Sequence, residues 1–137
     1  MGRIYLAGKL KGAESAFTEL STELEDRGHQ ITFKWWDPKN PELPTPYLDH
    51  TESSAAAAIA MREAVVSADT AVILFPTPKI LGAAIEFGIA LESQVDQPSR
   101  EIIVVGNPEI ERQSVFYADP AVIVLKSIAG IRNRAWY

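Results

Sequence analysis

The chain has 137 residues, of which 47% are hydrophobic and 23% are charged, with a formal net charge of -5 and no cysteine. This size and composition predict a single globular domain that needs no disulfide or zinc staple, and they exclude cysteine chemistry. The acidic balance argues against broad binding of a nucleic-acid polymer, and no apolar run reaches the roughly 20 residues that span a bilayer. The first residues show no signal-peptide pattern, so we expect a soluble, cytoplasmic protein with no membrane partner.

The predicted elements alternate between strand and helix along the chain. In chain order they are a strand at 4–7, a helix over 13–24 followed by the C-cap Gly28, a strand at 31–35, a proline-rich loop at about 36–52, a helix from Ser53 or Ser54 to about Ser67, a strand at 71–75, a helix from about Gly82 to Glu92, strands at 102–105 and 122–125, and a helical turn at 127–131. The residues at 132–137 are expected to form a loose tail or to dock on a partner subunit.

The predicted strands are continuous apolar runs, which is typical of a parallel sheet covered by helices on both faces. We therefore expect one doubly wound, three-layer α/β domain over residues 1–137, with a five-stranded parallel sheet in the flavodoxin-like order 2-1-3-4-5. Ligands of such folds bind outside the carboxyl ends of the strands. The loops after Ala7, Trp35, Phe75 and Val105 are therefore the candidate binding loops.

Glu86 is the one polar side chain, up to Leu91, of a predicted helix that reads GAAIEFGIALE. A helix that is apolar all round is buried on most sides, and a buried carboxylate is costly unless it is paired or used. Small residues at 82–84 leave room for a ligand to approach the backbone. These features favour an ionised carboxylate aimed into a pocket, as a nucleophile or an electrostatic anchor. The alternative is a glutamate on a solvent-facing edge or in a capping position.

Several segments together resemble the nucleoside 2-deoxyribosyltransferase superfamily, which includes the 2'-deoxynucleoside 5'-monophosphate N-hydrolases. The segment that starts at Asp69 has the strand TAVILF, the turn PTP and then GAAIEFG, and the family pattern Gly-x-x-x-Glu-Leu-Gly stands here with Phe87 in place of leucine. The opening IYLAGKLKG and the tryptophans at 35 and 36 are similar to further family features. Residues 114–117 (SVFY) resemble the stretch that enters a neighbouring subunit's site.

The resemblance implies a role for each matching residue. Glu86 would attack the anomeric carbon and expel the base, Tyr5 would orient the carboxylate, and water or a second base would resolve the glycosyl-enzyme ester. Other residues would line the substrate site: Gly8, Lys9 and Lys11 in the first loop, Thr77 and Lys79 in the turn before the helix, Gly82 at the helix start, and Ser114 from the partner subunit. The lysines suit a phosphate, and their alternative is an ordinary solvated loop position. For Ser114 the alternative is a helix or turn cap.

The sequence departs from the family pattern at Met61, where the family usually carries an aspartate that holds the base or handles its proton. Arg62 and Glu63 flank this position, and Glu63 would lie on another face of the helix. The leaving base therefore lacks an evident general acid, unless Asp37 or Asp49 supplies it from the proline-rich loop. Met61 would pack on a base or on the core. Of Trp35 and Trp36, one is expected in the core and the other over the site.

Two functions of different class follow from this pattern. The first is an enzyme that cleaves or transfers the N-glycosidic bond of a nucleoside or nucleoside 5'-monophosphate through Glu86. The second is a catalytically silent protein of the same fold that binds such a molecule, which Met61 favours; a purely structural oligomer subunit is a weaker third reading. The resemblance implies a homodimer or larger homo-oligomer. No metal site and no organic cofactor are expected, because no His, Asp and Glu cluster has ligand spacing.

Overall fold

The computed structural model describes residues 2–8, 14–37, 51–77, 81–106 and 114–134. Within these ranges the strands are β1 (Arg3–Gly8), β2 (Gln30–Ile31), β3 (Thr70–Leu74), β4 (Glu101–Val105) and β5 (Val122–Leu125). The helices are α1 (Glu14–Asp26), α2 (Thr51–Val66), α3 (Leu81–Ser93), the 3-10 helix η3 (Val115–Ala118) and α4 (Ile128–Arg132). No helix in these ranges combines the length and the apolar character needed to cross a membrane.

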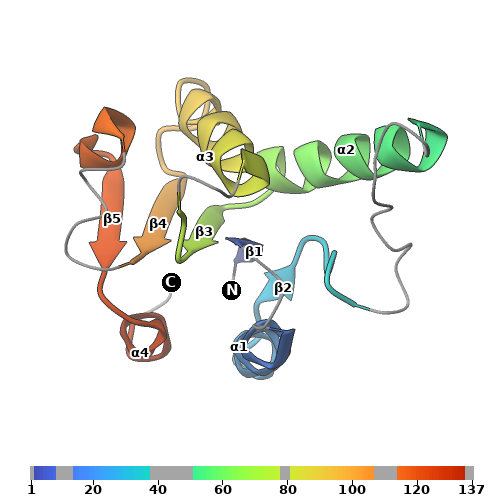
Figure 1. Cartoon of the computed structure of the whole chain (residues 1–137). Helices are drawn as coiled ribbons and strands as arrows, with labels where there is room; N and C mark the ends of the chain where they lie inside the picture. Colours follow the sequence, from blue (N-terminus) through green and yellow to red (C-terminus); the bar gives the residue numbers. More distant parts are fainter. Residues whose placement is uncertain (1, 9–13, 38–50, 78–80, 107–113, 135–137) are drawn as a thin grey trace.

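The strands form one parallel sheet in the order β2-β1-β3-β4-β5, as expected. Helices α2 and α3 and the 3-10 helix η3 lie on one side of this sheet, and α1 and α4 lie on the other (Figure 1). Because each parallel connection must cross from one end of the sheet to the other, every strand is followed by a helical segment or a long loop. The predicted doubly wound α/β fold is therefore confirmed.

Apolar side chains fill both faces of the sheet. On the α2–α3 side the buried cluster consists of Tyr5, Ala7, Ala64, Val65, Ala68, Ala71, Ile73, Ala83, Phe87, Ala90, Ile102, Val104 and Tyr117. On the α1–α4 side it consists of Ile4, Leu6, Phe17, Leu20, Leu24, Ile31, Trp36, Val72, Leu74, Ile103, Val105 and Ile131. Neighbouring residues of one strand alternate between the two clusters, as the pleat of a strand requires. This explains why the central strands are apolar at every position after their first residues, Arg3, Thr70 and Glu101.

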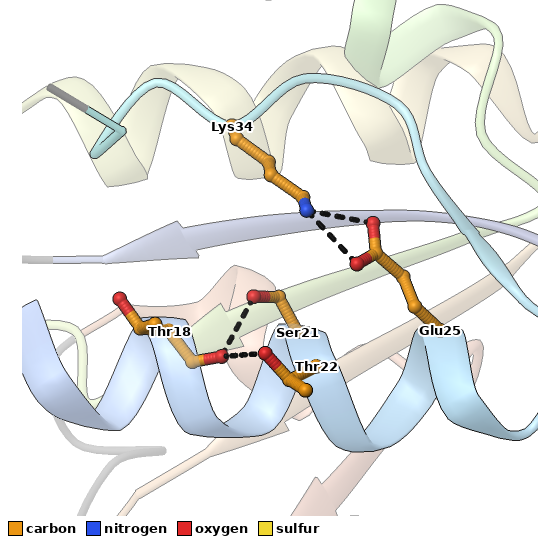
Figure 2. A network of polar contacts seen from close by, with 5 residues as sticks. All are labelled: Thr18, Ser21, Thr22, Glu25 and Lys34. Atoms are coloured by element: carbon orange, nitrogen blue, oxygen red, sulfur yellow. Dashed lines mark hydrogen bonds and ion pairs between the residues drawn. The ribbon is translucent and has the colours of Figure 1, made fainter. Parts of the chain in front are cut away.

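The second strand is shorter than predicted, since β2 ends at Ile31 and the chain turns at Trp35 and Trp36. Two contacts hold this turn in place. Figure 2 shows Lys34 bridging from the turn to Glu25 on α1, with its Nζ 2.8 Å from Oε1 of that carboxylate. The indole Nε1 of Trp35 donates a hydrogen bond of 2.8 Å to the carbonyl oxygen of Leu6. Side-chain contacts to α1 and β1 have replaced the strand ladder that the alternating pattern predicted.

The helix α2 begins at Thr51, ahead of the two serines expected to cap it. The helix α3 covers the predicted span, but it is buried on one face only. Ala83, Glu86 and Phe87 are buried, whereas Leu81 and Ile85 are 72% and 54% exposed. The expectation that this apolar helix is buried on most sides is therefore wrong for the single chain. The hydrophobic face that remains open is available for packing against another molecule.

The last described residues are tied to the rest of the domain. Arg132 forms an ion pair with Glu23 on α1, with Nε 2.7 Å from Oε2, and Arg134 pairs with Glu101 at the start of β4. The expected tail at 132–137 is thus held to its own chain at 132–134, and 135–137 lie outside the described residues.

Candidate functional site

A cavity of about 410 Å³ opens between α2 and α3. From α2 it is lined by Ser54, Ala57, Ala58, Met61 and Arg62, and from α3 by Gly82, Ile85, Glu86 and Ile89. The lining residues of each helix recur at spacings of three and four, which places them on one helical face. A volume of this size suits a small-molecule ligand, and the walls are apolar except at a few positions.

Glu86 is the buried charged group of this cavity. Its residue is 8% exposed, and its Oε2 atom has no hydrogen-bond partner among the described residues. Burial raises the pKa of the Glu86 carboxyl from its ordinary value near 4.5 to about 7, and the nearby Tyr5 hydroxyl offsets part of that rise. A buried carboxylate without a counter-ion among the described residues is costly to keep, which makes Glu86 a candidate functional residue.

Tyr5 reaches the same place from β1. Its side chain is fully buried, and its hydroxyl also has no hydrogen-bond partner in the described part of the chain. Burial, followed by the charge and the contact of Glu86, raises the pKa of the Tyr5 phenol well above its ordinary value, so the hydroxyl keeps its proton. The two groups influence each other without meeting in a hydrogen bond of normal geometry. A small shift brings the phenol to donate to the carboxylate, and catalytic contacts are often this long before substrate binds.

The α2–α3 cavity also brings Met61 and Gly82 to Glu86. Gly82 lies one helical turn before the carboxylate, and a Cβ added to it would sit 3.9 Å from Oε1. Met61 lines the same cavity from α2, at the position where the resemblance implies an aspartate. Predicted residues from β1, α2 and α3 thus converge on one place.

Other predicted site residues lie elsewhere. Trp36 is buried in the core on the α1 side, and Trp35 packs edge-on against it and against Phe17. Neither lines the α2–α3 cavity, and Trp35 is fixed by its bond to the carbonyl of Leu6. Ser114 caps η3, because its hydroxyl oxygen accepts a hydrogen bond of 3.3 Å from the backbone N–H of Phe116.

Gly8 ends β1 in a conformation that side chains rarely adopt, with φ +151°, and it lies against Leu74 of β3. Thr77 is exposed just after β3, and Asp37 closes the turn after Trp36 through its backbone bond to the carbonyl of Lys34. The remaining candidates are Lys9, Lys11, Lys79 and Asp49, which fall outside the described residues. The lysine phosphate site therefore stays a prediction.

Arg62 is the cavity residue that the sequence analysis named only as a neighbour of Met61. Its residue type alone carries no functional signal, because an arginine on an alanine-rich helix is usually a solvated side chain. The available signal was its spacing, since Arg62 lies four positions after Ala58 and next to Met61 on the predicted helix. In the structure it supplies the one basic side chain of the described cavity lining.

The described residues contain no cluster of three or more His, Asp or Glu side chains arranged to hold a metal ion. What the site can do chemically rests on its two buried polar groups. A carboxylate that is half ionised near neutral pH can attack an electrophilic carbon or hold a positive charge, and a protonated phenol can orient it. The small residues beside it leave space for the reacting atom.

The fold and site together define a doubly wound α/β protein with a buried carboxylate beneath an apolar cavity. Among solved structures it is similar to the CMP N-glycosidase BcmB of Clostridium botulinum, with a TM-score of 0.59 and 18% sequence identity over 95% of this chain and 94% of that one. This similarity confirms the expected fold, that of the nucleoside 2-deoxyribosyltransferase-like proteins, and at this identity it shows the fold alone. No family model matches the chain, and no curated protein matches it.

Proposed function

We propose that this protein cleaves the N-glycosidic bond of a nucleoside or nucleoside 5'-monophosphate, with Glu86 as the nucleophile. The observation that carries the proposal is the Glu86 carboxylate itself, which is buried, unpartnered at Oε2 and open to a ligand-sized cavity. The likeness of the fold to a protein named as a CMP N-glycosidase supports the same type of reaction. The expected lysines of the loops at 9–11 and 79 support a 5'-phosphate on the substrate.

The reaction forms and breaks bonds in two steps. A carboxylate oxygen of Glu86 bonds to the anomeric carbon, and the C–N bond to the base breaks with its electron pair moving onto the base nitrogen. Water then adds to the same carbon, the ester bond breaks, and Glu86 returns as a carboxylate. A second base in place of water would give transfer instead of hydrolysis. Tyr5 holds the carboxylate in line through the first step, since its protonated phenol can donate to the oxygen that does not attack.

Binding without cleavage is a second candidate function, and one observation favours it. Met61 faces the cavity and offers no proton, so no side chain of the described lining other than Glu86 can act as an acid toward a leaving base. A protein of this kind would hold a nucleotide in the α2–α3 cavity and release it unchanged. Release of free base from candidate substrates distinguishes the two functions.

The test is chromatographic detection of free base. The protein is incubated with deoxyribo- and ribonucleosides and their 5'-monophosphates, with and without a second base, beside the Glu86→Gln variant. We expect base release by the wild type and a loss on the order of 10³-fold or more in the variant, because the nucleophile is gone. Binding of a nucleotide in a thermal-shift screen with no base release from any substrate would instead support the silent binding protein.

Gly82→Ala is expected to lower base release roughly tenfold or more while leaving the fold intact. The added methyl would sit 3.9 Å from Oε1 of Glu86, where the sugar has to approach, and small displacements at a reacting centre are costly. Gly88→Ala on the same helix is the matched control, because a methyl there meets nothing within 4 Å. Both changes favour helix by up to about 1 kcal/mol. Equal activities of the two variants would contradict the placement of the sugar beside Gly82.

We also propose that the protein acts as a homodimer or larger homo-oligomer. Val115 and Phe116 on η3 are 80% and 63% exposed, and α3 carries the exposed Leu81 and Ile85. The elements η3 and α3 lie on the same side of the sheet (Figure 1). An apolar surface of this kind is typical of an interface between subunits. We expect sedimentation velocity to give a multiple of the chain mass, and Phe116→Asp to shift it toward the monomer. A wild-type monomer at micromolar concentration would contradict the proposal.

A further inference from the structure

Arg62 and Glu86 line the same cavity from two different helices. Arg62 lines it from α2 and Glu86 from α3, and the rest of the described lining carries no other charge. No hydrogen bond or ion pair joins the Arg62 guanidinium to the described residues, and the side chain is exposed. The cavity therefore offers a substrate one buried carboxylate and one open guanidinium, separated by apolar walls.

These two groups impose a condition on the leaving base. In the proposed reaction Glu86 is ionised when it attacks, so it has no proton to give. Arginine keeps its proton in proteins and acts as a hydrogen-bond donor, not as a general acid. Met61 and the small lining residues supply no acid either. The Tyr5 phenol donates to Glu86 in that reaction and keeps its proton, since burial and the charge of Glu86 raise its pKa. This lining therefore does not assist a base that must be protonated before it can leave. It favours cleavage of a base that leaves as a stable anion.

We infer that Arg62 binds the departing base as an anion, and that the substrate carries a base of the pyrimidine-2,4-dione class, such as uracil. This inference rests on the proposed function and specifies its substrate. When the C–N bond breaks, the electron pair stays on the ring nitrogen and spreads onto the two carbonyl oxygens. The departing N1 and the neighbouring O2 are adjacent acceptors on one edge of the anion, so the guanidinium fork can donate two parallel hydrogen bonds to them, which is the geometry in which arginine binds anions most strongly. Water later adds to the sugar, and the proton that it loses neutralises the base.

The inference separates this protein from the structural neighbour, whose name places cytosine on its substrate. Cytosine and adenine leave as weakly stabilised anions unless a ring nitrogen is protonated first, and the described lining provides no acid for that step. The specificity inferred for this chain therefore rests on its own residues Met61 and Arg62 and not on its fold.

The test compares uracil and cytosine nucleoside monophosphates on the wild type, Arg62→Gln, Arg62→Lys and the control Glu63→Gln. Glu63 is exposed on α2 and does not line the cavity. We expect faster release of uracil than of cytosine by the wild type, and a loss of uracil release of about 10- to 100-fold in Arg62→Gln, the size of one charged hydrogen-bonding contact. Arg62→Lys should keep part of the rate, and Glu63→Gln should keep all of it.

A second readout distinguishes stabilisation of the leaving group from a structural effect. Fluorine at position 5 of uracil stabilises the anion, so the 5-fluorouracil substrate should lose less rate in Arg62→Gln than the uracil substrate. A rise of severalfold in the fluorouracil-to-uracil ratio is the expected result. An unchanged ratio, or a preference for cytosine, would overturn the inference while leaving Glu86-dependent cleavage intact. Failure of the wild type to release any base would instead remove the proposed function, and the inference with it.

Discussion

The Glu86→Gln variant is expected to be more stable than the wild type above pH 7, by up to about 3 kcal/mol. Burial raises the pKa of the Glu86 carboxyl to about 7 in the folded protein, whereas the unfolded chain has the ordinary value near 4.5. The folded state thus holds this proton more tightly, so its stability falls as the pH rises from about 4.5 to 7. A shift of this size corresponds to roughly 3 kcal/mol at about 1.4 kcal/mol per unit, and glutamine removes the charge that causes it.

Urea unfolding at pH 5 and pH 8 measures this effect. The variant should gain little at pH 5 and most at pH 8, and it should lack base release at both. Glu63→Gln, which removes an exposed carboxylate from α2, should show no such gain. If Glu86→Gln has the same pH dependence as the wild type, or is less stable at pH 8, then the carboxylate is not held at a cost in the folded protein.

Gly8→Ala is expected to destabilise the protein by about 3 kcal/mol or more. A Cβ at this position would lie 2.6 Å from the carbonyl oxygen of Leu74 and 3.2 Å from both the Leu74 Cβ and the Phe17 Cζ. The first of these contacts is with backbone, which cannot move without breaking the pairing of β1 with β3. The φ of +151° adds strain of its own for any residue with a side chain.

Equilibrium unfolding in urea should show a much lower midpoint for Gly8→Ala. Gly88→Ala, whose added methyl meets nothing within 4 Å, is the matched control and should lose nothing. A Gly8→Ala protein within about 0.5 kcal/mol of the wild type would mean that β1 and β3 do not approach this closely at their carboxyl ends. Tyr5 lies on the same strand, so the position of its hydroxyl depends on this approach.

The strands were predictable because they depend on a strong local signal, and their order follows from the doubly wound topology that alternating strands and helices favour. Residues 71–75 and 102–105 are apolar at every position, and a strand with no polar face has to lie inside a sheet that helices cover on both sides. The second strand was overestimated for the opposite reason. The alternating residues at 31–35 fit either a strand or a turn with two anchored tryptophans. Only the contacts of Trp35 and Lys34 in the structure show that this segment is a turn.

The burial of Glu86 was predictable from its isolation on an apolar helix, but the extent to which the rest of that helix is buried was not. The helix α3 buries one face in its own chain and leaves Leu81 and Ile85 open. A sequence pattern records that a face is apolar and not which molecule covers it. Helical spacing places Arg62 beside Met61, but its place in the same cavity as Glu86 depends on α2 and α3 lying side by side, a long-range contact that spacing does not give.

The central claim is that Glu86 bonds to the sugar, and trapping that bond tests it most directly. A nucleoside 5'-monophosphate with fluorine at the 2' carbon is the probe, because fluorine destabilises the positively charged transition state and slows loss of the ester. We expect intact-mass measurement to show one added sugar phosphate, peptide mapping to place it on Glu86, and Glu86→Gln to show none. Base release that continues in the wild type without any adduct, and at an undiminished rate in Glu86→Gln, would contradict the account.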